Sequence, residues 1–153
     1  MRLERYGLEV QVPTGWEGRV FRLPGTRPTL HAANFALPVR DGNFGAAATA
    51  AMADDGVFVA VVEYDPRLAG RGLFGHQGVP VPLRVRDVNP RAMQHVVPGR
   101  FGVQRFFSEA GRAFCLYAVI GSSPTRETLI GKANDLLRSI QIDGRSPSPT
   151  PGG

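Results

Sequence analysis

The stretch that decides the fold is Val57–Tyr64, which reads VFVAVVEY and is apolar at every position before Glu63. A second stretch, Ala113–Ile120, reads AFCLYAVI and is apolar at every position. A strand that is apolar on both faces normally lies in the centre of a sheet and is covered on both sides. These two stretches therefore predict the centre of a sheet with a covering layer on each face.

Further strands are expected around this centre. Alternating or clustered apolar residues predict strands at Leu8–Val12, Trp16–Leu23, Thr29–Leu37 and Phe101–Ser108. Short turns join the first three of these strands, which predicts a meander, and the turn at 110–112 predicts a hairpin that leads into the second central strand. Leu83–Val88 is predicted as an edge strand because prolines flank it.

Two helices are predicted as well. Phe44–Asp54 is rich in alanine and therefore has a high helix propensity. A second helix is expected from Ser123, a capping residue, with Pro124 at its first helical position. Its apolar residues recur at helical spacing from Leu129 to Ile140. The predicted fold class is therefore α+β, with a mostly antiparallel sheet covered on both faces and an amphipathic C-terminal helix.

Length and composition indicate a single domain. A chain of 153 residues with 42% hydrophobic residues can bury a core without disulfides. We expect residues 1–143 to form the domain and residues 144–153, which are rich in Ser, Pro and Gly, to be a disordered tail. No apolar run approaches the ~18–20 residues of a membrane span, and no secretory signal is recognisable, so we expect a cytoplasmic protein. The single cysteine, Cys115, is predicted to be a buried small hydrophobe.

The chain is basic, with a net charge of +5 and a pI of about 10.3. A positive charge of this size is typical of proteins with an anionic partner. However, Lys132 is the only lysine among the 18 basic residues, and the arginines are scattered among acids from Arg2 to Arg145. Nucleic-acid surfaces normally cluster their cations. We therefore expect another protein as the partner and consider nucleic acid improbable.

Three patterns resemble known sites but lack what those sites require. Gly70–Gly75 matches GxGxxG, yet the proline-containing stretch after it excludes the helix that a dinucleotide site needs. Arg100–Phe107 shares only part of the RNA-recognition strand pattern, and the βαββαβ order of that fold is missing. His31, His76 and His95 do not have a zinc-site spacing. We expect no cofactor and no metal site.

The segment Asp65–Gly99 is where the sequence points to a function. It contains five prolines and only one predicted strand. A long irregular segment in a compact domain is usually either functional or poorly ordered. The candidate binding residues are the arginines and histidines of this segment: Arg67, Arg71, His76, Arg84, Arg86, Arg91 and His95.

Three functional hypotheses follow. The leading one is a non-catalytic protein-binding or assembly module, because no reactive set of residues accompanies the segment. The second is a small-ligand-binding protein or an enzyme, with a pocket between the sheet and residues 65–99 that uses Glu63, His76 or His95. The third is weak binding of an anionic polymer or nucleic acid through arginines, with an affinity that falls steeply with salt.

The opening of the chain also suggests a family. Tyr6–Trp16, YGLEVQVPTGW, resembles the YGxxxxxPxGW opening of PsbP-like domains, the superfamily of the extrinsic photosystem II subunit and the Ran-binding Mog proteins. The last predicted strand and the helix ending in Leu136–Ile140 resemble the end of that superfamily. The resemblance implies a bacterial member with an α/β/α sandwich and a binding or assembly role without catalysis. It carries over no site residue, because no manganese, calcium or Ran site matches.

Overall fold

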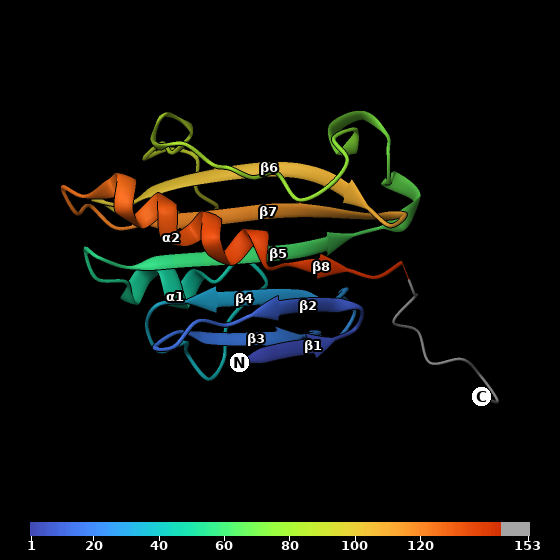
Figure 1. Cartoon of the computed structure of the whole chain (residues 1–153), viewed down its shortest axis with the longest axis horizontal. Coiled ribbons are helices and arrows are strands. Elements are labelled where there is room, and N and C mark those ends of the chain that lie inside the picture. The colour runs from blue at the N-terminus through green and yellow to red at the C-terminus, as the bar shows by residue number, and fades with distance from the viewer. Residues whose placement is uncertain (145–153) are drawn as a thin grey trace.

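The computed structural model describes residues 1–144 and contains two antiparallel sheets and two α-helices (Figure 1). The five-stranded sheet has the order β3 (Glu17–Phe21), β4 (Thr29–Ala33), β5 (Val57–Tyr64), β7 (Arg112–Ile120), β6 (Phe101–Glu109). The three-stranded sheet has the order β1 (Arg2–Arg5), β2 (Leu8–Gln11), β8 (Gln141–Ile142). The helices are α1 (Ala46–Ala51) and α2 (Arg126–Arg138). The α+β class with antiparallel sheets and a C-terminal helix is therefore confirmed.

The two apolar stretches form the middle of the larger sheet, as the sequence predicts. β5 and β7 pair along their whole length, from Val57 opposite Ile120 to Tyr64 opposite Ala113. Successive side chains of a strand point to opposite faces, and those of β5 divide between two separate apolar clusters. Both faces of this sheet are therefore buried.

One face is covered by α2 and the three-stranded sheet. Leu129 and Leu136 of α2 and Leu8 and Val10 of β2 are buried in the same cluster as the odd-numbered residues of β5. In Figure 1, α2 runs across β5 and β7, and β2 lies over β4. The amphipathic stripe of the helix thus packs on the sheet, which agrees with the sequence pattern.

The opposite face is covered by α1 together with loop residues. Ala48 and Met52 of the helix region pack with Phe58 and Tyr117 of the sheet, and Met93 joins them from the long segment. The sequence left open whether the alanine-rich helix or the proline-rich segment covers this face. The structure shows that both contribute.

The segment from residue 65 to residue 99 wraps around β6, the outer strand of the sheet. Phe74 packs against Phe106 on the α1 side, with ring centroids 5.3 Å apart. Leu83 is buried on the α2 side. The Leu83 N–H donates a hydrogen bond to the Asn134 side-chain oxygen at 2.7 Å, and the Asn134 side-chain amide donates one to the Leu83 carbonyl at 2.9 Å. Isolated bridges tie the segment to the edge of β6, from Gln77 to Ser108 and from Asn89 to Gly102. The segment therefore protects an edge that would otherwise be open for pairing.

Several sequence predictions need correction. Leu83–Val88 is not a strand but contains the 3₁₀ turn η3 (Val85–Asp87), because Asp87 folds back to accept a hydrogen bond from the Arg84 N–H. The helix expected at 44–54 is shorter in the structure, where α1 covers only Ala46–Ala51. The strands expected at 16–23 and 29–37 end at residues 21 and 33. The C-terminal helix begins at Arg126, because the Ser123 hydroxyl accepts the Thr125 N–H in a turn before it.

Two strands were not predicted, namely β1 and β8. The tail predicted at 144–153, and with it the domain boundary at 143–144, falls almost wholly on residues 145–153, which lie outside the part of the chain that the structure describes. Between residues 1 and 144, no helix has the length and apolar character needed to cross a membrane.

Candidate functional site

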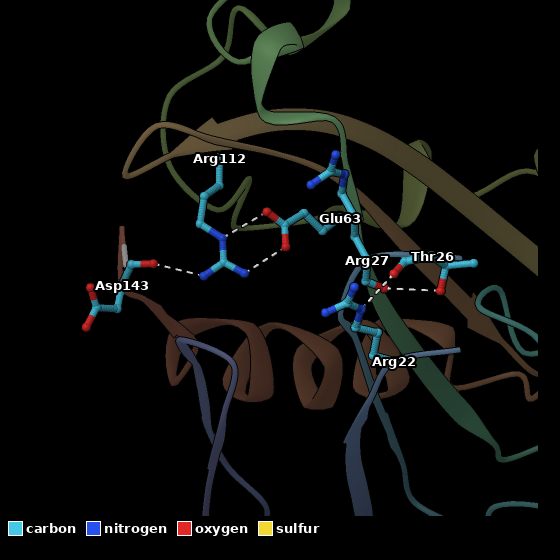
Figure 2. Close-up of polar contacts among 6 residues, drawn as sticks. All are labelled: Arg22, Thr26, Arg27, Glu63, Arg112 and Asp143. Atoms are coloured by element: carbon cyan, nitrogen blue, oxygen red, sulfur yellow. Dashed lines mark hydrogen bonds and ion pairs between the residues drawn. The ribbon is translucent and has the colours of Figure 1, made fainter. Parts of the chain in front are cut away.

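A buried ion pair closes one end of the larger sheet (Figure 2). The Arg112 Nε and Nη2 atoms donate to the two carboxylate oxygens of Glu63 at 3.0 and 2.7 Å, and Nη1 donates to the Asp143 carbonyl at 2.9 Å. Both side chains of the ion pair are only 4% exposed. Such bidentate pairing satisfies a buried carboxylate and fixes its orientation.

This pair is a structural clamp. Both oxygens of Glu63 accept from the same guanidinium, so the carboxylate has the geometry of a paired group and not of a general base. The third bond, to the Asp143 carbonyl, ties the end of β8 to the start of β7. Glu63 is one of the residues that the pocket hypothesis would use, and in the structure its carboxylate is occupied by Arg112.

A basic surface lies beside the clamp. The β3–β4 turn carries Arg22, Thr26 and Arg27 and adjoins the end of β5, since the Glu63 N–H donates to the Pro28 carbonyl at 3.2 Å (Figure 2). The Arg22 Nε donates to the Thr26 carbonyl at 3.0 Å, which holds that side chain along the turn. Both arginines are exposed. Across residues 1–144, no hydrogen bond engages the Arg27 guanidinium.

The neighbouring acid on this surface is already paired. Asp65 accepts from the Arg67 side chain, at 3.1 Å from Nε and 2.7 Å from Nη2, and also from the Arg67 N–H. These hydrogen bonds, with smaller contributions from the charges of Arg67 and Arg27, lower the pKa of Asp65 to about 2. Asp65 therefore stays ionised and neutralises Arg67, whereas Arg22 and Arg27 keep their charge. We call Arg22, Arg27 and Arg67 the arginine surface.

A groove of about 440 Å³ adjoins this surface on the face of β3 that looks toward α1. Its lining consists of apolar side chains and cations with one acid: Phe21, Leu23, Val39, Arg19, Arg22, Arg40 and Asp41. Asp41 accepts hydrogen bonds from the N–H groups of Gly42, Ala47 and Ala48, each at 2.9 Å, so its carboxylate is occupied at the start of α1. The groove therefore combines an apolar interior with a cationic rim.

The seven candidate residues of the long segment are all exposed, but they do not form one site. Arg71 and His76 lie near Ser108, whose side chain accepts from the Gly70 N–H at 2.8 Å and whose N–H donates to the His76 carbonyl at 2.7 Å. Arg91 and His95 lie near the opposite end of β6, because Asn89 pairs with Gly102. Gly102 and Ser108 are six positions apart along β6, which corresponds to roughly 20 Å of strand.

The remaining candidates, Arg84 and Arg86, flank the 3₁₀ turn η3 between these two groups. His76 and His95 are separated in the same way, so the structure does not unite them with Glu63 in one pocket. Within residues 1–144, no three His, Cys, Asp or Glu side chains come together as possible ligands of a metal ion.

The groove is not among the sites that the sequence predicts. Arg19, Phe21 and Leu23 alternate along one strand, and residues spaced by two lie on one face, so this spacing was the available signal. What it could not show is the approach of the loop with Val39 and Arg40. The Arg19 guanidinium fixes that loop by donating to the carbonyls of Pro38 and Val39.

Other residues singled out in the sequence have structural roles. Cys115 is buried as predicted, and desolvation raises the pKa of its thiol to about 12. His31 is buried, and desolvation lowers its pKa to about 4 even though its Nε2 atom lies 2.7 Å from the Asn43 carbonyl oxygen. Gly72–Phe74 is the 3₁₀ turn η2, so the GxGxxG pattern does not open an α-helix. Phe106 is packed beneath the long segment against Phe74.

Comparisons with known proteins find no match among protein-family models, curated proteins or solved structures. The resemblance to PsbP-like domains therefore stays a prediction from the sequence.

Proposed function

We propose that this chain is a non-catalytic protein-binding module that takes an acidic segment of its partner on the arginine surface and the adjacent groove. The observation that supports this proposal is that Arg22 and Arg27 are exposed and form no ion pair within residues 1–144. The neighbouring acids are already occupied: Glu63 by Arg112, Asp65 by Arg67, and Asp41 by backbone N–H groups. Exposed arginines whose neighbouring acids are already paired attract carboxylates and speed association with an acidic partner.

A protein is favoured over a nucleic acid because the aromatic group of the groove is not free to stack. Phe21 is half-buried and meets His31 edge to face, with ring centroids 4.8 Å apart, and the Arg19 guanidinium lies over its ring, 5.9 Å from the centroid. Proteins that bind single-stranded nucleic acid stack bases on open aromatic faces. A groove with aliphatic walls and a cationic rim fits amino-acid side chains better.

The PsbP-like sandwich belongs to this proposal as well. A large sheet with one helix and a small sheet on one face, and a short helix on the other, is compatible with that superfamily. The binding or assembly role that the resemblance implies agrees with the role proposed from the arginine surface.

The proposal is tested with fluorescein-labelled poly-glutamate, using fluorescence anisotropy at low and moderate salt. We expect binding that weakens as salt screens the charges. The double variant Arg22→Gln/Arg27→Gln should lose about tenfold in affinity, equivalent to about 1.4 kcal/mol. The matched control, Arg91→Gln/Arg138→Gln, removes the same net charge from exposed positions elsewhere and should change affinity much less.

Two results would contradict the proposal. Equal losses in the two double variants would mean that only net charge matters and that the arginine surface has no special role. Tighter binding of a single-stranded oligonucleotide than of poly-glutamate of equal length would favour the nucleic-acid hypothesis instead.

A further inference from the structure

The groove has a feature that a purely electrostatic surface does not need, which is an apolar interior. Val39 is 92% exposed, although it lies on a loop that the structure holds on both sides. Before it, the Glu17 carboxylate accepts the Leu37 N–H at 2.8 Å, and Arg19 donates to the Pro38 carbonyl. After it, Asp41 is bound to N–H groups at the start of α1.

The groove is therefore formed before any partner arrives. The loop residues around Val39 have their backbone bonds to Arg19, and the opposite wall is β3, a strand paired to β4 along its length. A site that is already ordered loses less conformational entropy on binding. Its volume of about 440 Å³ lies within the range of sites for small ligands and side chains.

We infer that the groove receives an apolar side chain of the partner, flanked in the partner sequence by carboxylates that meet Arg22 and Arg40. This inference rests on the proposed function and specifies its ligand as an acidic peptide with one large apolar residue, such as Phe or Leu. Charge complementarity selects this occupant: the walls Phe21, Leu23 and Val39 favour an apolar side chain inside the groove, and the arginines favour carboxylates around it and disfavour a basic ligand.

The test compares two labelled peptides of equal charge, Glu-Glu-Phe-Glu-Glu and Glu-Glu-Ser-Glu-Glu, both blocked at their ends. We expect the wild-type chain to bind the Phe peptide about tenfold more tightly than the Ser peptide. The variant Leu23→Ser/Val39→Ser should reduce this preference to about threefold or less, while its affinity for the Ser peptide stays unchanged. The control Val96→Ser, at a position that is 66% exposed on another part of the surface, should keep the full preference.

Equal wild-type binding of the two peptides would overturn the inference, and so would a preference that survives in Leu23→Ser/Val39→Ser. If poly-glutamate binding still depends on Arg22 and Arg27 in that case, the proposed function stands and only the inference about the groove fails. Absence of binding to poly-glutamate and to both peptides would instead overturn both. Thermal unfolding of each variant checks that the substitutions leave the domain folded.

Discussion

Replacing Arg112 by Met should destabilise the domain strongly, because it leaves the Glu63 carboxylate buried without a partner. Both side chains are 4% exposed, so water cannot take over the role of the guanidinium without opening the structure. Removing one member of a buried pair costs about 3–5 kcal/mol. A domain of this size has a free energy of unfolding of about 5–15 kcal/mol, so the loss is at least a fifth of the total.

The measurements are urea unfolding and thermal unfolding, both followed by the fluorescence of Trp16, the only tryptophan. With a shift of about 2–4 °C per kcal/mol for a chain of about 150 residues, the midpoint of thermal unfolding should fall by about 6–20 °C. The double variant Glu63→Leu/Arg112→Met removes both charges, and replacing a whole buried pair by apolar residues is often neutral. It should therefore recover most of the loss.

An exposed pair on the same side of the molecule provides the control. Asp65 and Arg67 are joined by a 2.7 Å contact, but the Arg67 side chain is 88% exposed. The variant Asp65→Asn/Arg67→Gln should leave the unfolding midpoint almost unchanged, because water replaces the lost interaction. The reasoning is refuted if Arg112→Met costs less than about 1 kcal/mol, or if the double variant at Glu63 and Arg112 is as unstable as the single one.

Three further outcomes are expected. Asn134→Ala should cost about 2–4 kcal/mol, since the N–H and carbonyl of Leu83 lose their buried partner, and hydrogen exchange of residues 79–85 should become faster in the same variant. His31 has an ordinary pKa of 6.5 that burial lowers to about 4, so the unfolded chain takes up the proton first. The free energy of unfolding should therefore keep its full value above pH 6.5 and fall by up to about 3 kcal/mol as the pH is lowered toward 4. Urea unfolding of His31→Gln should show a smaller pH dependence over this range. The Cys115 thiol, with its pKa raised to about 12, should react with Ellman's reagent at pH 8 only after unfolding, and rapid labelling of the folded chain would contradict its burial.

The sequence predicts the centre of the fold well because the signal there is local. Every residue from Val57 to Val62 is apolar, and this alone requires a covered strand. The stripe from Leu129 to Leu137 likewise determines which face of α2 is buried. In both cases the burial of a residue follows from neighbours within one element.

The unpredicted parts depend on contacts between distant residues. β8 has only two residues and is a strand because Leu8 pairs with Ile142 and Glu9 with Gln141 across most of the chain. The long segment gives no periodic pattern because it crosses from one face of the sheet to the other, so Phe74 and Leu83 are buried in different surroundings. A pattern that changes sides within ten residues resembles neither a strand nor a helix.

The candidate site has the same limitation. The alternation of Arg19, Phe21 and Leu23 is local and could have been recognised, but the loop that completes the groove lies about twenty residues away. Glu63 and Arg112 are separated by 49 positions, and nothing near Glu63 in the sequence indicates a cationic partner. Scattered arginines can therefore converge in space, and the structure shows which of them form no ion pair within residues 1–144.

The two edges of the larger sheet differ in how they are covered. Along β6, the long segment supplies backbone bonds near both ends, through Asn89 and Gln77, and its proline-rich sequence serves this covering role. Along β3, the Val20 carbonyl instead receives a side-chain contact from Arg5, at 3.4 Å. Charged side chains at an open edge discourage pairing with a second copy of the same chain. In the proposed function, Arg22 and Arg27 just beyond the end of β3 attract a chain of opposite charge, so cations near this edge would both discourage self-pairing and bind an acidic partner.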